Sequence, residues 1–119
     1  MGLFVRVKKT DEKELLKTHS LGGCIITRSL YEGASKLKWI FREESVNPAD
    51  NGWRALGDTD TEEYINILEN NLVVDFDTLV EIEPAVLAIY DMPVGTDLEF
   101  CHDETGRYFI DSNTGQRIP

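Results

Sequence analysis

The chain of 119 residues has little cysteine and no long apolar run. Its two cysteines, Cys24 and Cys101, are too few for the disulfide framework of a small secreted domain, which usually needs four or more. We expect both thiols to be reduced and buried. No run approaches the roughly 18 apolar residues that cross a bilayer, and the initial MGLFVRVKK has no hydrophobic signal-peptide segment. These absences predict a soluble, cytoplasmic protein.

Basic residues are absent between Arg54 and Arg107, and the whole chain has 12 Lys and Arg against 22 Asp and Glu, a net charge of −10. Residues 1–54 carry ten basic and seven acidic residues, or +3, whereas residues 55–119 carry two basic and fifteen acidic residues, or −13. Such a surface repels phosphate backbones and anionic lipids, so we expect no nucleic-acid or membrane partner. A cationic protein partner fits the charge, as does an acidic surface that only keeps the protein soluble.

The composition otherwise indicates a globular protein. Apolar residues make up 41% of the chain, and they include five Phe, four Tyr and two Trp. A chain of this length can bury roughly two thirds of its unfolded surface. The sequence shows no internal repeat, low-complexity tract or linker, so we predict a single domain over residues 1–119.

The first half of the chain predicts a strand and a short helix in LFVRVKK and DEKELLK, followed by two further strands. CIITRSL is apolar on both faces at its start, as in a strand that is covered on both sides. In KLKWIFREE, Leu37, Trp39 and Phe41 share one face of a period-two pattern, which predicts Trp39 in the core. ESVNPADNG predicts an irregular loop, after which GWRAL re-enters the fold.

The second half predicts a helix over residues 60–70, because Thr59 and Glu62 match a capping box, with Asp60 as an alternative cap. LVVDFDTLVEI then changes to period two, which predicts a strand with one acidic face. On this strand the expected outward residues are Asp75, Asp77, Glu81 and Glu83, and the expected inward residues are Val74, Phe76, Val80 and Ile82. The alternative is a helix capped at Asp77.

The remaining elements are a short helix and a hairpin. PAVLAIY, with Pro84 at a first helical position, predicts the helix, and DLEFCH and RYFID predict the hairpin. We expect the tail after Asp111 to be loose. The fold class is therefore α+β, with a mainly antiparallel sheet of about five strands and two or three short helices.

The sequence offers no convincing metal site. Asp58, Asp60, Glu62 and Glu69 approximate the spacing of an EF-hand loop, but Glu63 stands where that loop needs glycine. Cys101, His102 and Asp103 could join Cys24 or His19 around zinc. However, consecutive strand residues point to opposite faces, and the chain has no Cys-x-x-Cys spacing. We expect neither a metal nor another cofactor.

Catalysis is not expected either. A Cys-His pair drawn from the same cysteines and histidines would need a thiol with a lowered pKa, and no basic neighbours are evident in the sequence. Paired carboxylates are abundant but have no defined geometry, and the glycines match neither a phosphate loop nor a dinucleotide-binding motif. A small hydrolase that uses a carboxylate or a Cys-His pair is the least favoured alternative.

One family resemblance emerges from several short motifs in order: GGCIITRSL, KWIFREESVNPADNGWRAL, GDTDTEEY and EIEPAVLAIYDMPVGTDLEF. The more specific pieces are Trp39 with Arg42 and Glu43, the turn Asn51-Gly52-Trp53-Arg54, and Pro93-Val94-Gly95. From about Gly22 to about Phe109 the chain resembles a bacterial domain of unknown function that is also grouped as predicted immunity protein family thirty-three of polymorphic toxin systems. The resemblance implies an α+β domain that neutralises a toxin, by genomic association, and it names no catalytic residue.

The acidic residues suggest how such a protein would act. Toxins that attack nucleic acid present basic clefts, to which an acidic inhibitor would be steered electrostatically. The candidate partner-binding residues are Asp58, Asp60, Glu62, Glu63, Asp75 and Asp77, together with Trp53 beside the predicted loop. The alternative is an accessory or small-ligand-binding domain without catalytic activity, in which residues 47–53 form a pocket.

Overall fold

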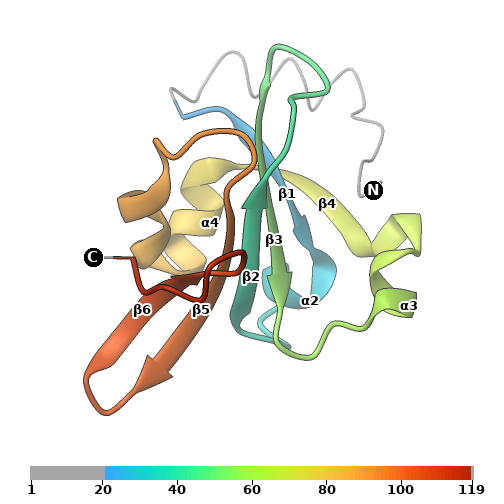
Figure 1. Ribbon diagram of the computed structural model, residues 1–119. Coiled ribbons are helices and arrows are strands. Elements are labelled where there is room, and N and C mark those ends of the chain that lie inside the picture. The colour runs from blue at the N-terminus through green and yellow to red at the C-terminus, as the bar shows by residue number, and fades with distance from the viewer. Residues whose placement is uncertain (1–20, 119) are drawn as a thin grey trace.

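The computed structural model describes residues 21–118, so the strand and helix predicted within residues 1–20 lie outside the described residues. Across residues 21–118 a six-stranded sheet has the order β4-β1-β3-β2-β5-β6 (Figure 1). The strands are β1 (Gly23–Thr27), β2 (Leu37–Arg42), β3 (Asp50–Gly57), β4 (Asn71–Asp75), β5 (Asp97–Asp103) and β6 (Gly106–Asp111). Only β1 and β3 pair in parallel. The prediction of an α+β fold with a mainly antiparallel sheet is confirmed.

Short helices connect the strands. They are α2 (Arg28–Tyr31), α3 (Glu62–Ile65), α4 (Phe76–Ile82) and the 3-10 helices η1 (Leu68–Asn70) and η2 (Pro84–Ile89). α4 and η2 lie together on one side of the sheet, whereas α3 lies near the opposite end of β4 (Figure 1). None of the helices within residues 21–118 is long and apolar enough to span a membrane.

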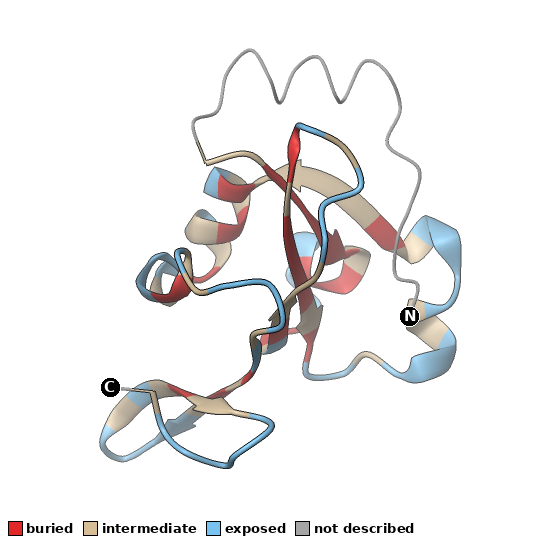
Figure 2. Cartoon of the chain, turned by 45° about the horizontal axis from the view of Figure 1, so that its top comes forward, coloured by how far each residue is buried: buried red, intermediate tan, exposed pale blue. Residues whose placement is uncertain are grey.

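The core lies between the sheet and the α4–η2 pair. Phe76 and Leu79 of α4 and Val86 and Ile89 of η2 are buried against the inner face of the strands. The strands contribute Cys24, Ile26, Ile40, Trp53, Ala55, Leu98, Phe100 and Phe109 to the same cluster. Figure 2 shows the buried residues concentrated along the central strands, while α3 is exposed.

The two tryptophans exchange their predicted places. The register between β2 and β3 shifts between Leu37 and Trp39, which inserts one residue and changes the phase of the alternation. Leu37 and Ile40 therefore point inward, and Trp39 is 38% exposed. Trp53 is 0% exposed, and its indole N–H donates to the Tyr90 carbonyl at 3.1 Å. The prediction of a core Trp39 is wrong, because a bulge is invisible to a period-two pattern. Trp53, a candidate for a binding surface only because of the predicted loop beside it, lies in the core because β3 begins inside that loop.

The helix predicted over residues 60–70 is divided into α3 and η1. Its cap is Thr61, whose hydroxyl accepts from the Tyr64 N–H at 3.1 Å, and not Thr59 or Asp60. Asp60 is held by other contacts, since its carboxylate accepts from the Ser29 hydroxyl and from the Gly57 N–H. Because these contacts hold one oxygen each of the Asp60 carboxylate, Asp60 does not cap the helix.

The strand predicted over LVVDFDTLVEI ends at Asp75, where α4 begins. The Asp75 carboxylate accepts from the Thr78 N–H at 2.9 Å, so it is Asp75 and not Asp77 that caps this helix. The expected alternation of inward and outward side chains over residues 74–83 is therefore wrong. At the end of that segment Glu83 is buried instead of facing outward, and it pairs with Arg107 at 2.8 Å.

The tail after Asp111 folds back along β6 and is not loose. The Ile118 N–H donates to the Phe109 carbonyl at 2.8 Å, and Ile110 forms an isolated antiparallel bridge with Arg117. Ile118 packs against the hydrophobic core. These contacts anchor residues 112–118 to the outer edge of the hairpin, which the sequence alone did not indicate.

β3 begins inside the predicted loop, where it forms a tight corner with the end of β2. Gly52 has a φ of +89°, and its carbonyl accepts from the Glu43 N–H at 2.9 Å. The Arg42 guanidinium crosses the corner and donates to the carbonyls of Asn51 at 2.9 Å and Met92 at 2.8 Å. The corner thus ties β2, β3 and the segment before β5 together.

A buried charge cluster lies beside this corner. The Arg54 side chain is 0% exposed and donates to both Asp50 oxygens, at 2.8 and 2.9 Å, and to Glu43 at 2.6 Å. Burial raises the pKa of Asp50, but the hydrogen bonds from Arg54, Gly52 and Val46 outweigh it, so that the pKa lies below its usual value. The hydrogen bonds of Asp50 therefore fix a segment that the sequence predicted to be an irregular loop.

We predict that this pairing makes the protein sensitive to acid. Because the pKa of Asp50 is lower in the folded state, its stabilising contribution is present above the unfolded value of about 4 and is lost as the pH falls through the folded value. Urea unfolding between pH 5 and pH 2 should show a steeper loss of stability for the wild type than for Asp50→Asn. Equal slopes would contradict the assignment.

Candidate functional site

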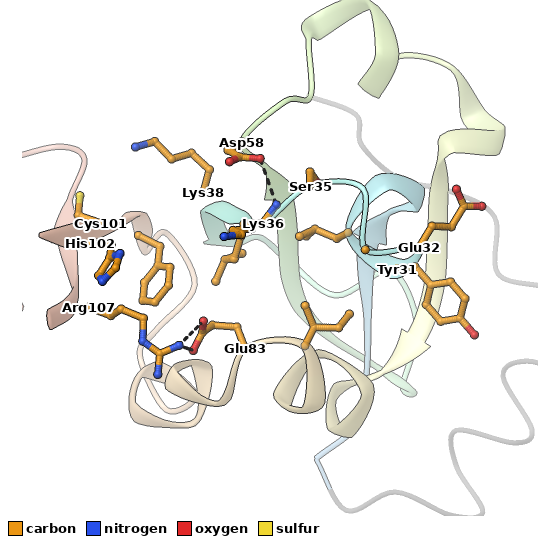
Figure 3. Close-up of a pocket in the computed structure, with 15 residues that line it drawn as sticks. Tyr31, Glu32, Ser35, Lys36, Lys38, Asp58, Glu83, Cys101, His102 and Arg107 are labelled. Carbon is orange, nitrogen blue, oxygen red and sulfur yellow. Dashed lines mark hydrogen bonds and ion pairs between the residues drawn. The ribbon is translucent and has the colours of Figure 1, made fainter.

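Two exposed features of the described chain are candidates for binding, and the first is a cavity of about 930 Å³. It opens where β5 and β2 diverge, because the ladder between them spans only residues 39–41 and 97–99, although β2 extends back to Leu37 and β5 on to Asp103. The β5–β6 hairpin diverges from the rest of the sheet there (Figure 1). In Figure 3, Cys101, His102 and Arg107 lie on one side, across from the residues of the α2–β2 connection. We call this space the β2–β5 cleft.

The lining of the cleft combines apolar and charged side chains. Apolar contributions come from Leu30, Leu37, Ile82 and Phe100, and the charged residues at its edges are Glu32, Lys36, Lys38, Asp58, Glu83 and Arg107. Two of the cations are paired: Arg107 with Glu83 at 2.8 Å, and Lys38 with Glu99 at 2.7 Å. An apolar floor with charged edges is the usual character of a ligand or peptide site.

Cys101 and His102 do not form a catalytic pair. Cys101 stands opposite Tyr108 on one face of the hairpin, and His102 stands opposite Arg107 on the other. Burial and the neighbouring Glu99 raise the pKa of the Cys101 thiol, and burial raises that of Cys24 strongly. Both shifts oppose thiolate formation at neutral pH, which a nucleophilic cysteine requires.

The second feature is an acidic protrusion formed by α3, η1 and the turn before them. Asp58 is exposed and accepts from the Lys36 N–H at 3.1 Å, while Glu62 and Glu63 are exposed in the first turn of α3. Ile67 and Leu68, in the next turn, are each 51% exposed. We call Asp58, Glu62, Glu63, Ile67, Leu68 and Glu69 the α3–η1 surface.

The fold separates the predicted partner-binding residues into two groups and a buried remainder. Asp58, Glu62 and Glu63 belong to the α3–η1 surface, but the Asp60 carboxylate turns inward to Ser29 and Gly57. Asp75 ends β4 at the strand terminus away from α3, and Asp77 follows it in α4 (Figure 1). Trp53 is buried and cannot line a surface, as noted above.

The residues considered for metals are dispersed. Within residues 21–118 no group of three or more His, Cys, Asp or Glu side chains is arranged to hold a metal ion. Cys24 is buried in the core, far along the sheet from Cys101 in β5, and His19 lies outside the described residues. Of the acids with EF-hand spacing, Glu62 lies in the first turn of α3, which Thr61 caps.

The predicted loop pocket is also too small for a ligand. Asn47 and Asp50 line a space of only about 10 Å³, which is barely the volume that one water needs. Asp50 continues into β3, and the Asn47 side chain bonds to the backbone N–H of Ala49 at 2.9 Å. The alternative in which residues 47–53 form a binding pocket stays a prediction, which this space within residues 21–118 does not support.

These features define a small α+β domain with an acidic protrusion and a charged cleft. Residues 24–110 match the family model of the Immunity protein Imm33 domain. The chain belongs to this immunity protein family, which confirms the resemblance inferred from the sequence motifs. No curated protein and no solved structure matches the chain.

The motifs that carry the family resemblance are structural. Glu43 and Arg54 form the buried cluster, and Arg42, Asn51 and Gly52 build the corner. The turn Pro93-Val94-Gly95 joins the same corner, because the Gly95 N–H donates to the Arg42 carbonyl at 2.9 Å. The binding candidates lie elsewhere. Ile67 and Leu68 in particular lie within the helix predicted over residues 60–70, and no local signal shows whether the apolar side chains of such a helix are exposed or buried.

Proposed function

We propose that this protein neutralises a cognate bacterial toxin domain by binding it through the α3–η1 surface, without catalysis. Membership of the immunity protein family supports the general role. The observation that favours this surface is the pair of half-exposed side chains of Ile67 and Leu68 among exposed acids. Protein interfaces commonly combine an apolar centre with a polar rim.

Each part of the surface has its own contribution. Ile67 and Leu68 would be covered by the toxin, and because about half of each is already buried, complete burial would stabilise a complex by about 1 kcal/mol each. Arg28, whose guanidinium donates to the Glu69 carbonyl at 2.8 Å, is a cation at the edge of this surface. Asp58, Glu62 and Glu63 would steer the encounter, because their exposed carboxylates attract a basic surface through solvent. The expected partner is therefore a toxin domain with a basic surface.

The test uses a toxin domain whose gene neighbours the gene for this protein, sought first in the genome that encodes it. Co-expression should protect cells from that toxin, and the purified proteins should associate faster at low than at high salt. For Glu62→Lys with Glu63→Lys, we expect the association rate at low salt to fall by about tenfold or more. Stopped-flow mixing at two salt concentrations measures this effect.

A matched control separates the surface from the net charge. Asp91 and Glu104 are exposed outside the α3–η1 surface, so Asp91→Lys with Glu104→Lys makes the same change in charge. This variant should retain most of the association rate. Equal slowing by both variants would refute the surface, and an unprotected cell with no complex would refute neutralisation itself.

A further inference from the structure

The β2–β5 cleft exposes a strand edge within the sheet. β5 pairs with β6 along its whole length to Asp103, but its ladder with β2 stops at the pair Trp39–Glu99. The remaining part of β5 therefore faces the cleft on one side and β6 on the other. Exposed strand edges are templates for the addition of another strand.

The direction of the backbone groups follows from the ladder. In an antiparallel pair, hydrogen-bonding groups alternate between the two sides of a strand. The Thr96 carbonyl accepts from the Arg42 N–H of β2, and the Asp97 carbonyl accepts from the Ser112 N–H on the β6 side. By this alternation Leu98, and four residues further His102, direct their N–H and C=O toward the β2 side. No strand within residues 21–118 lies opposite His102 there. These two groups face the cleft.

The charges in the cleft favour an anionic occupant. Three cations, Lys36, Lys38 and Arg107, and three anions, Glu32, Asp58 and Glu83, line it. Each of the anions has a partner: Glu32 pairs with Arg28, Asp58 accepts from the Lys36 N–H, and Glu83 pairs with Arg107. Lys38 and Arg107 have carboxylate partners, whereas no carboxylate within residues 21–118 forms an ion pair with the exposed Lys36 ammonium. An acidic side chain in the cleft would find this ammonium beside an apolar floor of Leu37 and Phe100.

We propose that the β2–β5 cleft binds an extended acidic segment of a protein partner, which adds to β5 as a strand and places a carboxylate against Lys36. Backbone hydrogen bonds to His102 would hold the segment, and alternate apolar side chains would rest on the floor of the cleft. This mode of peptide recognition draws its affinity from the main chain and its specificity from side-chain sites. The inference stands apart from the α3–η1 surface and does not depend on it.

The probe is a fluorescent seven-residue peptide that alternates glutamate and valine, with a lysine–valine peptide of equal length as the control. We expect an increase in fluorescence anisotropy with the glutamate peptide only. Lys36→Glu should weaken binding by at least about tenfold, because it replaces attraction by repulsion. Arg117→Glu, which makes the same change outside the cleft, should leave binding unchanged.

The backbone contact has its own pair of variants. His102→Pro removes the N–H that faces the cleft and should abolish binding, whereas His102→Ala keeps that N–H and should retain it. In the wild type, addition of the peptide should slow hydrogen exchange at the His102 amide, which tests the contact even when His102→Pro fails to fold. The proposal is overturned if both peptides bind equally well or if neither binds. It is also overturned if free glutamate binds but the glutamate–valine peptide does not, or if hydrogen exchange at the His102 amide is unchanged.

Discussion

Replacing Arg54 with methionine is expected to lower the free energy of unfolding by about 3–5 kcal/mol, the usual cost of breaking a buried ion pair. The Arg54 guanidinium is fully buried and holds both oxygens of Asp50. Its removal leaves the Asp50 carboxylate, which is only 5% exposed, without its cationic partner. Since small domains have a total stability of about 5–15 kcal/mol, this single change brings the protein close to unfolding.

A matched variant tests whether the cost comes from burial. Glu43 pairs with the same guanidinium at 2.6 Å, but its side chain is 28% exposed. Glu43→Gln should therefore lower the free energy of unfolding by about 1 kcal/mol or less. The partly exposed side chain of Glu43→Gln can still be hydrated, and its amide oxygen can still accept a hydrogen bond from Arg54. Urea unfolding of both variants gives the comparison. Similar losses for the two would contradict the distinction between a buried and a half-buried partner.

Substitution of Gly52 by alanine is the second change with a large expected effect, about 2–5 kcal/mol of destabilisation. A Cβ atom at this position would lie 2.2 Å from the Glu43 carbonyl oxygen, and the backbone φ of +89° is itself unfavourable for alanine. Neither strand can move away freely, because the Glu43 N–H donates to the Gly52 carbonyl across the same corner.

Gly33 provides the control for Gly52. Its φ of +77° is also positive, but a Cβ atom there would meet nothing within 4 Å. Gly33→Ala should therefore lower the free energy of unfolding by only the cost of the positive φ, about 1–2 kcal/mol. Thermal unfolding of the two variants separates this backbone strain from the steric clash with Glu43 in Gly52→Ala. A Gly52→Ala protein as stable as Gly33→Ala would show that the corner can open without cost.

The predictions that succeeded rest on local chemistry. The hairpin of β5 and β6 and the strand β2 follow from alternating apolar residues, which need no distant information. Pro84 begins η2, as its fixed φ and missing N–H indicate. The family was also accessible, because its motifs keep their order along the chain even though each is short.

The predictions that failed depended on contacts between distant segments. The sequence contains several residues, close together, that could cap a helix. Thr61 and Asp75 are the actual caps because of where β3 and β4 end in the sheet. The face on which Trp39 lies was reversed by one extra residue in β2, whose effect appears only when the strand pairs with β3. Period-two patterns determine that a strand alternates, but its neighbours determine which side becomes the core.

The sequence by itself determined the class of fold, the family, and a net charge of −10. These properties are sums or local patterns, so they do not require a folded chain. The tertiary structure decided which charges are available: it buried Arg54 and Asp50, turned Asp60 inward and left Glu62 and Glu63 exposed. It also opened the β2–β5 cleft, because the point at which β2 and β5 separate, after Trp39 and Glu99, is set only when the sheet is assembled.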